Sequence, residues 1–217
     1  MGTLNVHVWH TKNVQNYMDL LAQSCEGLPD VEIVGYVHDE EVEDKSLQMG
    51  QTHKSSYHDL MIKRWKILLD IIESNIGNNI VWLDCDCVFN KSNKEFATTI
   101  NNYLEDNDFV HQYDPNSHMN ANINLGVTGI KCSEKTLQFV KDWYGYISTK
   151  TDRKLGFPQI EWNDMVLNYA DIKFAVMPDE LVATEYSIKS DKWLVYHAIG
   201  ITNPKEKFLK LQTRNTF

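Results

Sequence analysis

Residues 80–86 read Ile80-Val81-Trp82-Leu83-Asp84-Cys85-Asp86, an apolar run of four residues that is closed by two carboxylates. A short apolar run of this kind is consistent with a strand that is buried on both faces of a sheet. In open α/β sheets, ligands bind outside the carboxyl ends of the strands, which is where this run delivers its two carboxylates. The stretch therefore predicts an α/β fold with a ligand site around Asp84 and Asp86.

The spacing of the two aspartates suggests what they bind. Side chains alternate along a strand, so Asp84 and Asp86 can share one face while Cys85 and Cys87 point to the other. Two hard oxygen ligands suit Mg²⁺ or Mn²⁺, and such an ion commonly holds substrate phosphates. A turn that merely closes the strand is the alternative interpretation.

Two other patterns compete with this one. A second Asp-x-Asp, Asp106-Asn107-Asp108, follows no long apolar run, so we expect a solvated turn there. The four cysteines form no Cys-x-x-Cys pair, and we expect them to be reduced thiols. Cys85 and Cys87 could bind zinc together with a nearby histidine, but no second cluster has zinc-ligand spacing.

Composition limits the class of protein. The chain has 217 residues, of which 42% are hydrophobic and 24% charged, which fits one domain spanning residues 1–217. A formal net charge of −9 disfavours nucleic acid as the main partner. Neither a membrane span of roughly 20 apolar residues nor a signal peptide is present, so we expect a soluble, cytoplasmic protein.

The hydrophobic periodicity predicts alternating strands and helices, beginning with a parallel strand–helix–strand unit in the first forty residues. Ser133 and Asn163 are expected to cap helices, and polar loops are expected at residues 38–44 and 149–158. The expected strands lie at residues 4–8, 31–37, 80–83, 109–111, 125–130, 172–177 and 193–198. The expected helices lie at residues 14–21, 61–72, 133–147 and 163–169.

Three further segments accompany the aspartates: residues 122–127 (Asn-Ile-Asn-Leu-Gly-Val), residues 161–168 (Glu-Trp-Asn-Asp-Met-Val-Leu-Asn), and residues 196–200 (Tyr-His-Ala-Ile-Gly) with Lys205 beyond. Their order resembles that of the GT-A glycosyltransferases, nucleotide-sugar-dependent enzymes with an Asp-x-Asp metal motif. The chain looks nearest to their glycogenin-like and lipopolysaccharide galactosyltransferase-like group, and its compact length is similar to that of viral or bacterial members. The resemblance implies a single GT-A domain, Rossmann-like, with a mixed, mainly parallel central sheet flanked by helices.

The resemblance implies a metal site. Asp84 and Asp86 match the metal motif, and His197 matches the late histidine that completes the site in the family. Two carboxylates and one imidazole suit Mn²⁺ somewhat better than Mg²⁺, because imidazole is the softer ligand. His197 also lies in an apolar run, so a hydrogen-bonded core histidine is the alternative.

The resemblance also implies sugar-side residues. Asn124 and Gly126 resemble the Asn-x-Gly-Val strand that lines the donor sugar pocket, although they could simply shape a tight strand. Asn163 and Asp164 stand where the family has an Asp-Gln pair, which is a departure from the pattern. The candidate catalytic residues are therefore Asp164, Asn163 and Asn124.

Basic residues are the candidates for contact with the donor phosphates. Gly200 and Lys205 resemble a His-x-x-Gly-x-x-Lys segment, but the lysine comes two residues late, so Lys205 and Lys207 compete for the role. Lys63 and Arg64 occupy roughly the place of a basic donor contact, with an exposed helix face as the alternative. The full set of donor-contacting candidates is His10, Lys63, Arg64, Asp84, Gly126, Gly200, Lys205 and Lys207.

The activity implied by the resemblance is metal-dependent transfer of a sugar from a nucleotide diphosphate, with a UDP-sugar as the expected donor, to a glycan or glycoprotein acceptor. A divalent cation and a lysine would neutralise the charge that develops on the leaving diphosphate. A nucleotidyltransferase is the enzymatic alternative, but residues 9–13 lack the glycine-rich loop it needs. A nucleotide- or sugar-binding module without turnover is the other alternative.

Overall fold

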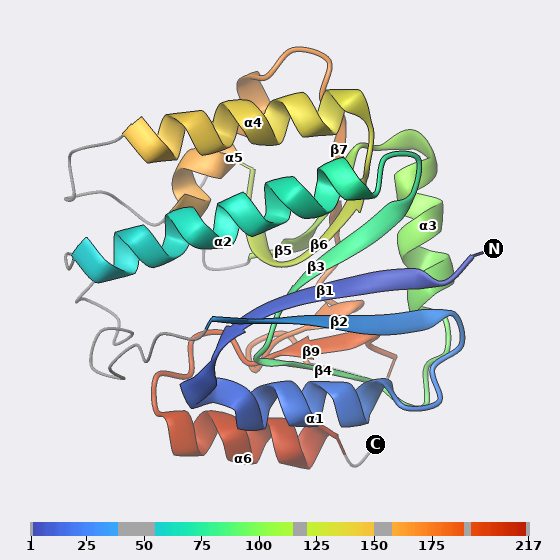
Figure 1. Cartoon of the computed structure of the whole chain (residues 1–217). Coiled ribbons are helices and arrows are strands. Elements are labelled where there is room, and N and C mark those ends of the chain that lie inside the picture. The colour runs from blue at the N-terminus through green and yellow to red at the C-terminus, as the bar shows by residue number, and fades with distance from the viewer. Residues whose placement is uncertain (1, 39–54, 115–120, 150–157, 189–191, 216–217) are drawn as a thin grey trace.

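A computed structural model describes residues 2–38, 55–114, 121–149, 158–188 and 192–215. The acidic residues 39–44 and the loop residues 150–157 lie outside this range. In the described part, a six-stranded sheet is covered by helices on both faces (Figure 1). The chain is therefore an α/β protein, as the sequence predicts.

The strands are β1 (Leu4–Thr11), β2 (Val31–His38), β3 (Asn79–Asp84), β4 (Cys87–Phe89), β5 (Phe109–Tyr113), β6 (Ile123–Lys131), β7 (Phe174–Met177), β8 (Val182–Ala183) and β9 (Val195–His197). The helices are α1 (Gln15–Cys25), α2 (Ser55–Ser74), α3 (Phe96–Asp106), α4 (Glu134–Thr149), α5 (Pro158–Asn168) and α6 (Pro204–Arg214), with one 3₁₀ turn, η1 (Lys12–Val14). None of the helices in the described part is both long and apolar enough to cross a membrane.

The central sheet has the strand order β2-β1-β3-β6-β5-β7, and β6 alone runs antiparallel to its neighbours. This arrangement confirms the expected mixed, mainly parallel sheet and the parallel pairing of β1 with β2. After Asp84 the chain makes a turn and enters a second, three-stranded sheet with the order β4-β9-β8. The Asp-x-Asp segment therefore lies at the passage from one sheet to the other.

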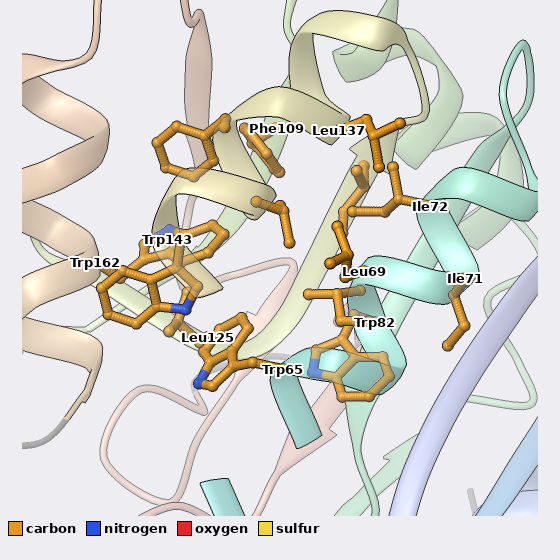
Figure 2. Close-up of a cluster of buried hydrophobic side chains, with 14 of the residues drawn as sticks. Trp65, Leu69, Ile71, Ile72, Trp82, Phe109, Leu125, Leu137, Trp143 and Trp162 are labelled. Atoms are coloured by element: carbon orange, nitrogen blue, oxygen red, sulfur yellow. The ribbon is translucent and has the colours of Figure 1, made fainter. Parts of the chain in front are cut away.

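The strand β3 is buried on both faces, because its apolar side chains alternate between two layers. Ile80 and Trp82 pack towards α2 and α4, while Val81 and Leu83 pack towards α1 and α3. Figure 2 shows Trp65, Trp143 and Trp162 gathered in the first layer. Burial of each such side chain contributes roughly 1.5–3 kcal/mol, so Asp84 follows a firmly held strand.

Two local expectations were wrong, and the helices α3 and α6 were not expected. Asp108 is buried rather than solvated, since its Oδ2 accepts a hydrogen bond from the Lys173 backbone N–H at 2.8 Å and pairs with Lys135 at 2.5 Å. Asn163 lies inside α5, which begins at Pro158, so it does not cap that helix. The cap at Ser133 is confirmed, because its Oγ accepts a hydrogen bond from the Thr136 N–H at 3.2 Å.

Candidate active site

Asp84 is the last residue of β3, and an arginine from the neighbouring helix α2 holds its carboxylate. Arg64 donates a hydrogen bond to Asp84 Oδ1, and its guanidinium lies 5.4 Å from the centre of the Trp82 ring. The Arg64 side chain is only 18% exposed, so the alternative of a solvated helix face does not apply to it. The pair places a positive charge directly beside the first aspartate of the motif.

Asp86 lies in the turn after β3 and meets a lysine from the C-terminal helix α6. Lys207 Nζ lies 2.5 Å from Asp86 Oδ2. Burial acts to raise the pKa of Asp86, but the charges of Lys207 and His197 outweigh it and lower this pKa well below its usual range. Asp86 is therefore an ionised carboxylate in a largely buried position.

His197 joins the two aspartates from β9. Its Nε2 lies 3.4 Å from Asp86 Oδ1 and 3.9 Å from Asp84 Oδ2, and the side chain is 4% exposed. On the other edge of the ring, Nδ1 lies 2.7 Å from Oε1 of Gln112 in β5. The structure thus brings together the three residues that the sequence offers as metal ligands.

The chemistry of these atoms fits a hard or borderline divalent cation, because carboxylate oxygens and one imidazole nitrogen converge. The Sγ atom of Cys87 belongs to the same group, in which ligand atoms of Asp86, Cys87 and His197 lie within 4.8 Å of one another. Burial, together with the charges of Asp86 and Asp84, raises the pKa of the Cys87 thiol well above its ordinary value. A neutral thiol is a poor metal ligand, so the oxygen and nitrogen atoms are the better donors.

A bulge in β6 lies beside this group. The pairing with β5 shifts between His111, which pairs with Thr128, and Gln112, which pairs with Asn124. Asn124 is buried, and its Oδ1 accepts a hydrogen bond from the Gly126 N–H at 2.7 Å. Asn124 and Gly126 therefore shape the strand next to His197.

The helix α5 carries the other two catalytic candidates. Asn163 is fully buried, and its amide bonds the backbone of Ile123 through both Oδ1 and Nδ2, each at 3.0 Å. Its Nδ2 also donates to the Gln159 carbonyl oxygen at 2.8 Å. This side chain fastens α5 to β6, whereas its neighbour Asp164 is exposed.

The remaining basic and glycine candidates differ in their placement. Lys205 is exposed at the start of α6, so the lysine that reaches the aspartates is Lys207. Gly200 has a φ of +77°, and a Cβ there would lie 2.8 Å from the Tyr186 hydroxyl oxygen. Lys63 is exposed on α2.

His10, the candidate nucleotide contact on β1, lies in the interior of the described part. It is buried on the face of β1 that packs against α1, and its Nε2 hydrogen-bonds Gln15 Oε1 at 2.9 Å. Sequence reasoning also missed two glutamines near the site, Gln112 and Gln159. Gln112 stands near the carboxyl end of β5, the same signal that singled out Asp84.

Comparison with known protein families identifies the family of the chain. A family model described as nucleotide-diphospho-sugar transferase matches residues 24–211. Among curated proteins, no significant sequence match is found.

Several solved structures share the fold. A glycosyltransferase involved in glycosylation of the major capsid of PBCV-1 has a TM-score of 0.68 at 15% identity, covering 97% of this chain and 99% of its own. The galactosyltransferase LgtC has a TM-score of 0.60 at 12% identity, with coverage of 97% and 95%. The glycosyltransferase GlyE of Streptococcus pneumoniae TIGR4 has a TM-score of 0.64 at 11% identity, covering 100% of this chain and 63% of its own.

At these identities the solved structures show the shared GT-A fold, while the family model covers most of the chain. The chain belongs to the nucleotide-diphospho-sugar transferase family and is a glycosyltransferase.

Proposed function

We propose that this glycosyltransferase depends on a divalent cation, with Mn²⁺ preferred over Mg²⁺, and uses a UDP-sugar to glycosylate a glycan or glycoprotein. The observation that carries the proposal is the convergence of Asp84, Asp86 and His197. One carboxylate oxygen of each aspartate lies 3.4–3.9 Å from Nε2 of the histidine. A cation held there would supply positive charge to the diphosphate as the sugar–phosphate bond breaks.

The chain's own residues complete the electrostatics of the site. Lys207 and Arg64 each contact one of the two aspartates, so both lie within reach of a diphosphate bound at the same place. Donors fixed in advance stabilise the charge of a leaving group without reorganisation during the reaction. We assign these two residues to the diphosphate.

Asp164 and Asn124 are the proposed sugar-side residues. Asp164 is exposed on α5, which Asn163 binds to the first residue of β6, and Asn124 is the second residue of that strand. A carboxylate and an amide on neighbouring elements can hydrogen-bond sugar hydroxyls and position the donor. Asn163 holds this arrangement together without meeting the substrate.

Calorimetry with UDP in Mn²⁺ and then in EDTA tests the metal dependence directly. We expect chelation to abolish most of the affinity, and we expect release of UDP from a UDP-sugar to require Mn²⁺. Equal UDP affinity in both solutions would contradict the metal assignment.

A matched pair of variants separates the site from general charge effects. Asp86→Asn removes a ligand charge while keeping the side-chain shape, and we expect turnover to fall by at least 100-fold, on the scale of losing a main electrostatic contact. Asp70→Asn removes a charge that pairs with Lys66 on the exposed face of α2, and it serves as the control. A similar loss in both variants would contradict the role of Asp86.

A further inference from the structure

Gln112 is a buried polar residue that the activity proposed above does not yet use. It lies in β5, it is fully buried, and its Oε1 lies 2.7 Å from Nδ1 of His197. Its Nε2 has no hydrogen-bond partner among the described residues. An unsatisfied buried amide costs roughly 1–3 kcal/mol, so an apolar residue would serve stability better at this position. The contact with His197 is the feature that a glutamine provides here.

The shifted register between β5 and β6 brings the two side chains together. Pairing moves from His111 with Thr128 to Gln112 with Asn124, so β6 bulges across residues 125–127. Gly126 lies inside that bulge, and a Cβ on it would lie 2.1 Å from Cε1 of His197. The bulge and the missing side chain leave room for the imidazole beside β6, within reach of Gln112.

The direction of the hydrogen bond decides which ring nitrogen faces the aspartates as a ligand. An amide oxygen can only accept, so Nδ1 of His197 carries the hydrogen, and in the neutral ring Nε2 then carries the lone pair. That Nε2 is the atom 3.4 Å from Asp86 and 3.9 Å from Asp84. A metal-ligating histidine needs a partner of this kind to set its tautomer and ring orientation.

We propose that Gln112 is the positioning residue of the site, holding His197 in the Nδ1–H tautomer so that Nε2 is presented to a divalent cation between Asp84 and Asp86. The inference rests on the proposed metal-dependent function. A neutral amide suits this place when no cation is bound, because a carboxylate at this buried position would add negative charge beside the two aspartates. Gln112 acts through His197 and does not touch the substrate.

Nitrogen-15 NMR of the histidine side chains tests the tautomer without any ligand. With ¹⁵N-histidine protein at pH 8, we expect the His197 signals, assigned by their loss in His197→Asn, to show the hydrogen on Nδ1. In Gln112→Met we expect this preference to be lost, and in Gln112→Glu, which keeps an acceptor oxygen, we expect it to be restored. A hydrogen on Nε2 in the wild type, or an unchanged tautomer in Gln112→Met, would overturn the proposal.

Mn²⁺ titration followed by electron paramagnetic resonance supplies the second readout. We expect Gln112→Met to lower Mn²⁺ affinity by 10–100-fold, the usual loss when the partner of a ligating histidine is removed. We expect Gln112→Glu to bind Mn²⁺ at least as tightly as the wild type, whereas a loss equal to that of Gln112→Met would overturn the role of the acceptor oxygen.

Thr128→Val is the matched control, because Thr128 Oγ1 lies 3.2 Å from Nδ1 of His111, a different histidine from His197. We expect this variant to keep the Mn²⁺ affinity of the wild type, and an equal loss in it would overturn the specific role of Gln112. Melting temperatures confirm that each variant is folded. If the wild type itself bound no Mn²⁺, the proposed function would fail, while the NMR result would still decide what Gln112 does.

Discussion

A Cβ atom on Gly126 would lie 2.1 Å from Cε1 and 2.7 Å from Nδ1 of His197, so the imidazole ring fills the space that a side chain at position 126 would take. Real Cβ atoms essentially never come within 3.0 Å of a heavy atom outside their own residue and its chain neighbours. The contact joins β6 of the central sheet to β9 of the small sheet. Gly126 therefore acts on the site through His197.

Gly126→Ala should displace His197 and weaken Mn²⁺-dependent UDP binding by at least tenfold. The added methyl group overpacks a buried contact, which typically costs about 1–3 kcal/mol of stability. Calorimetry with UDP and Mn²⁺, together with urea denaturation, measures the two effects. Gly145→Ala is the control, since a Cβ at this exposed position on α4 meets nothing within 4 Å. It should leave binding unchanged and stabilise the helix by up to about 1 kcal/mol.

Lys207 and Lys205 provide a paired test of the basic segment. Lys207 contacts Asp86, whereas Lys205 is exposed on the same helix. Lys207→Met should reduce UDP affinity in Mn²⁺ by roughly 10–100-fold, because a hydrogen bond to a charged group contributes about 1.5–3 kcal/mol. Lys205→Met should bind UDP almost as the wild type does. A larger loss of UDP affinity in Lys205→Met than in Lys207→Met would instead indicate that Lys205 contacts the diphosphate.

Lys207→Met should have the opposite effect on Mn²⁺ alone. Removing Lys207 frees Asp86 Oδ2 from its ion pair, so a cation no longer competes with the lysine for that carboxylate. Titration of Mn²⁺ without nucleotide should show tighter binding in this variant, while binding of UDP with Mn²⁺ weakens. Weakening of both would mean that Lys207 supports the fold of the site and does not compete for Asp86.

Asn163→Ala tests whether this residue is structural. The substitution leaves the backbone N–H and C=O of Ile123 without their buried partners, at roughly 1–3 kcal/mol for each group. We expect a loss of about 2–5 kcal/mol in urea denaturation. Asn168→Ala, on the exposed end of the same helix, should cost less than 1 kcal/mol. A large loss of turnover with unchanged stability would instead support the catalytic role expected from the sequence.

The elements nearest the active site were the most predictable part of the fold. The apolar run before Asp84 and the alternating residues of β1 show the periodicity of buried strands, and both strands lie where that pattern places them. The convergence of Asp84, Asp86 and His197 was also expected, but only from the order of motifs. Hydrophobic periodicity alone does not predict that His197 on β9 lies beside Asp86, which follows β3.

The local sequence pattern did not indicate the surroundings of three residues. Asn163 fits the local pattern of a helix cap, yet its partner is the backbone of Ile123 on β6. His10 ends a strand on the ligand side of the sheet, yet its face of β1 packs against α1. Gln112 stands near the carboxyl end of its strand, but the β-bulge that aims it at His197 has no sequence signal. A single sequence does not reveal such registers.

His111 gives the fold a measurable dependence on pH. Burial lowers the pKa of His111 from 6.5 to about 3, so the folded protein keeps this imidazole neutral while the unfolded chain takes up a proton. Its contribution to stability is therefore complete above pH 6.5 and is lost progressively as the pH falls towards 3. Within that window the free energy of unfolding should fall by about 1.4 kcal/mol per pH unit on account of this residue.

Urea denaturation between pH 6.5 and 5 measures this slope. His7, whose pKa burial lowers to about 4, adds to it in the same direction, so the test compares variants rather than absolute slopes. His111→Phe keeps a ring beside Phe109 and should remove the contribution of His111. The slope should flatten by about 1 kcal/mol per pH unit over this range, because the unfolded imidazole is only half protonated at pH 6.5. Thr128→Val breaks the hydrogen bond to His111 without removing the imidazole, and should lower stability while leaving the slope nearly unchanged. Equal slopes in the wild type and His111→Phe would show that His111 accepts its proton in the folded state as easily as in the unfolded chain.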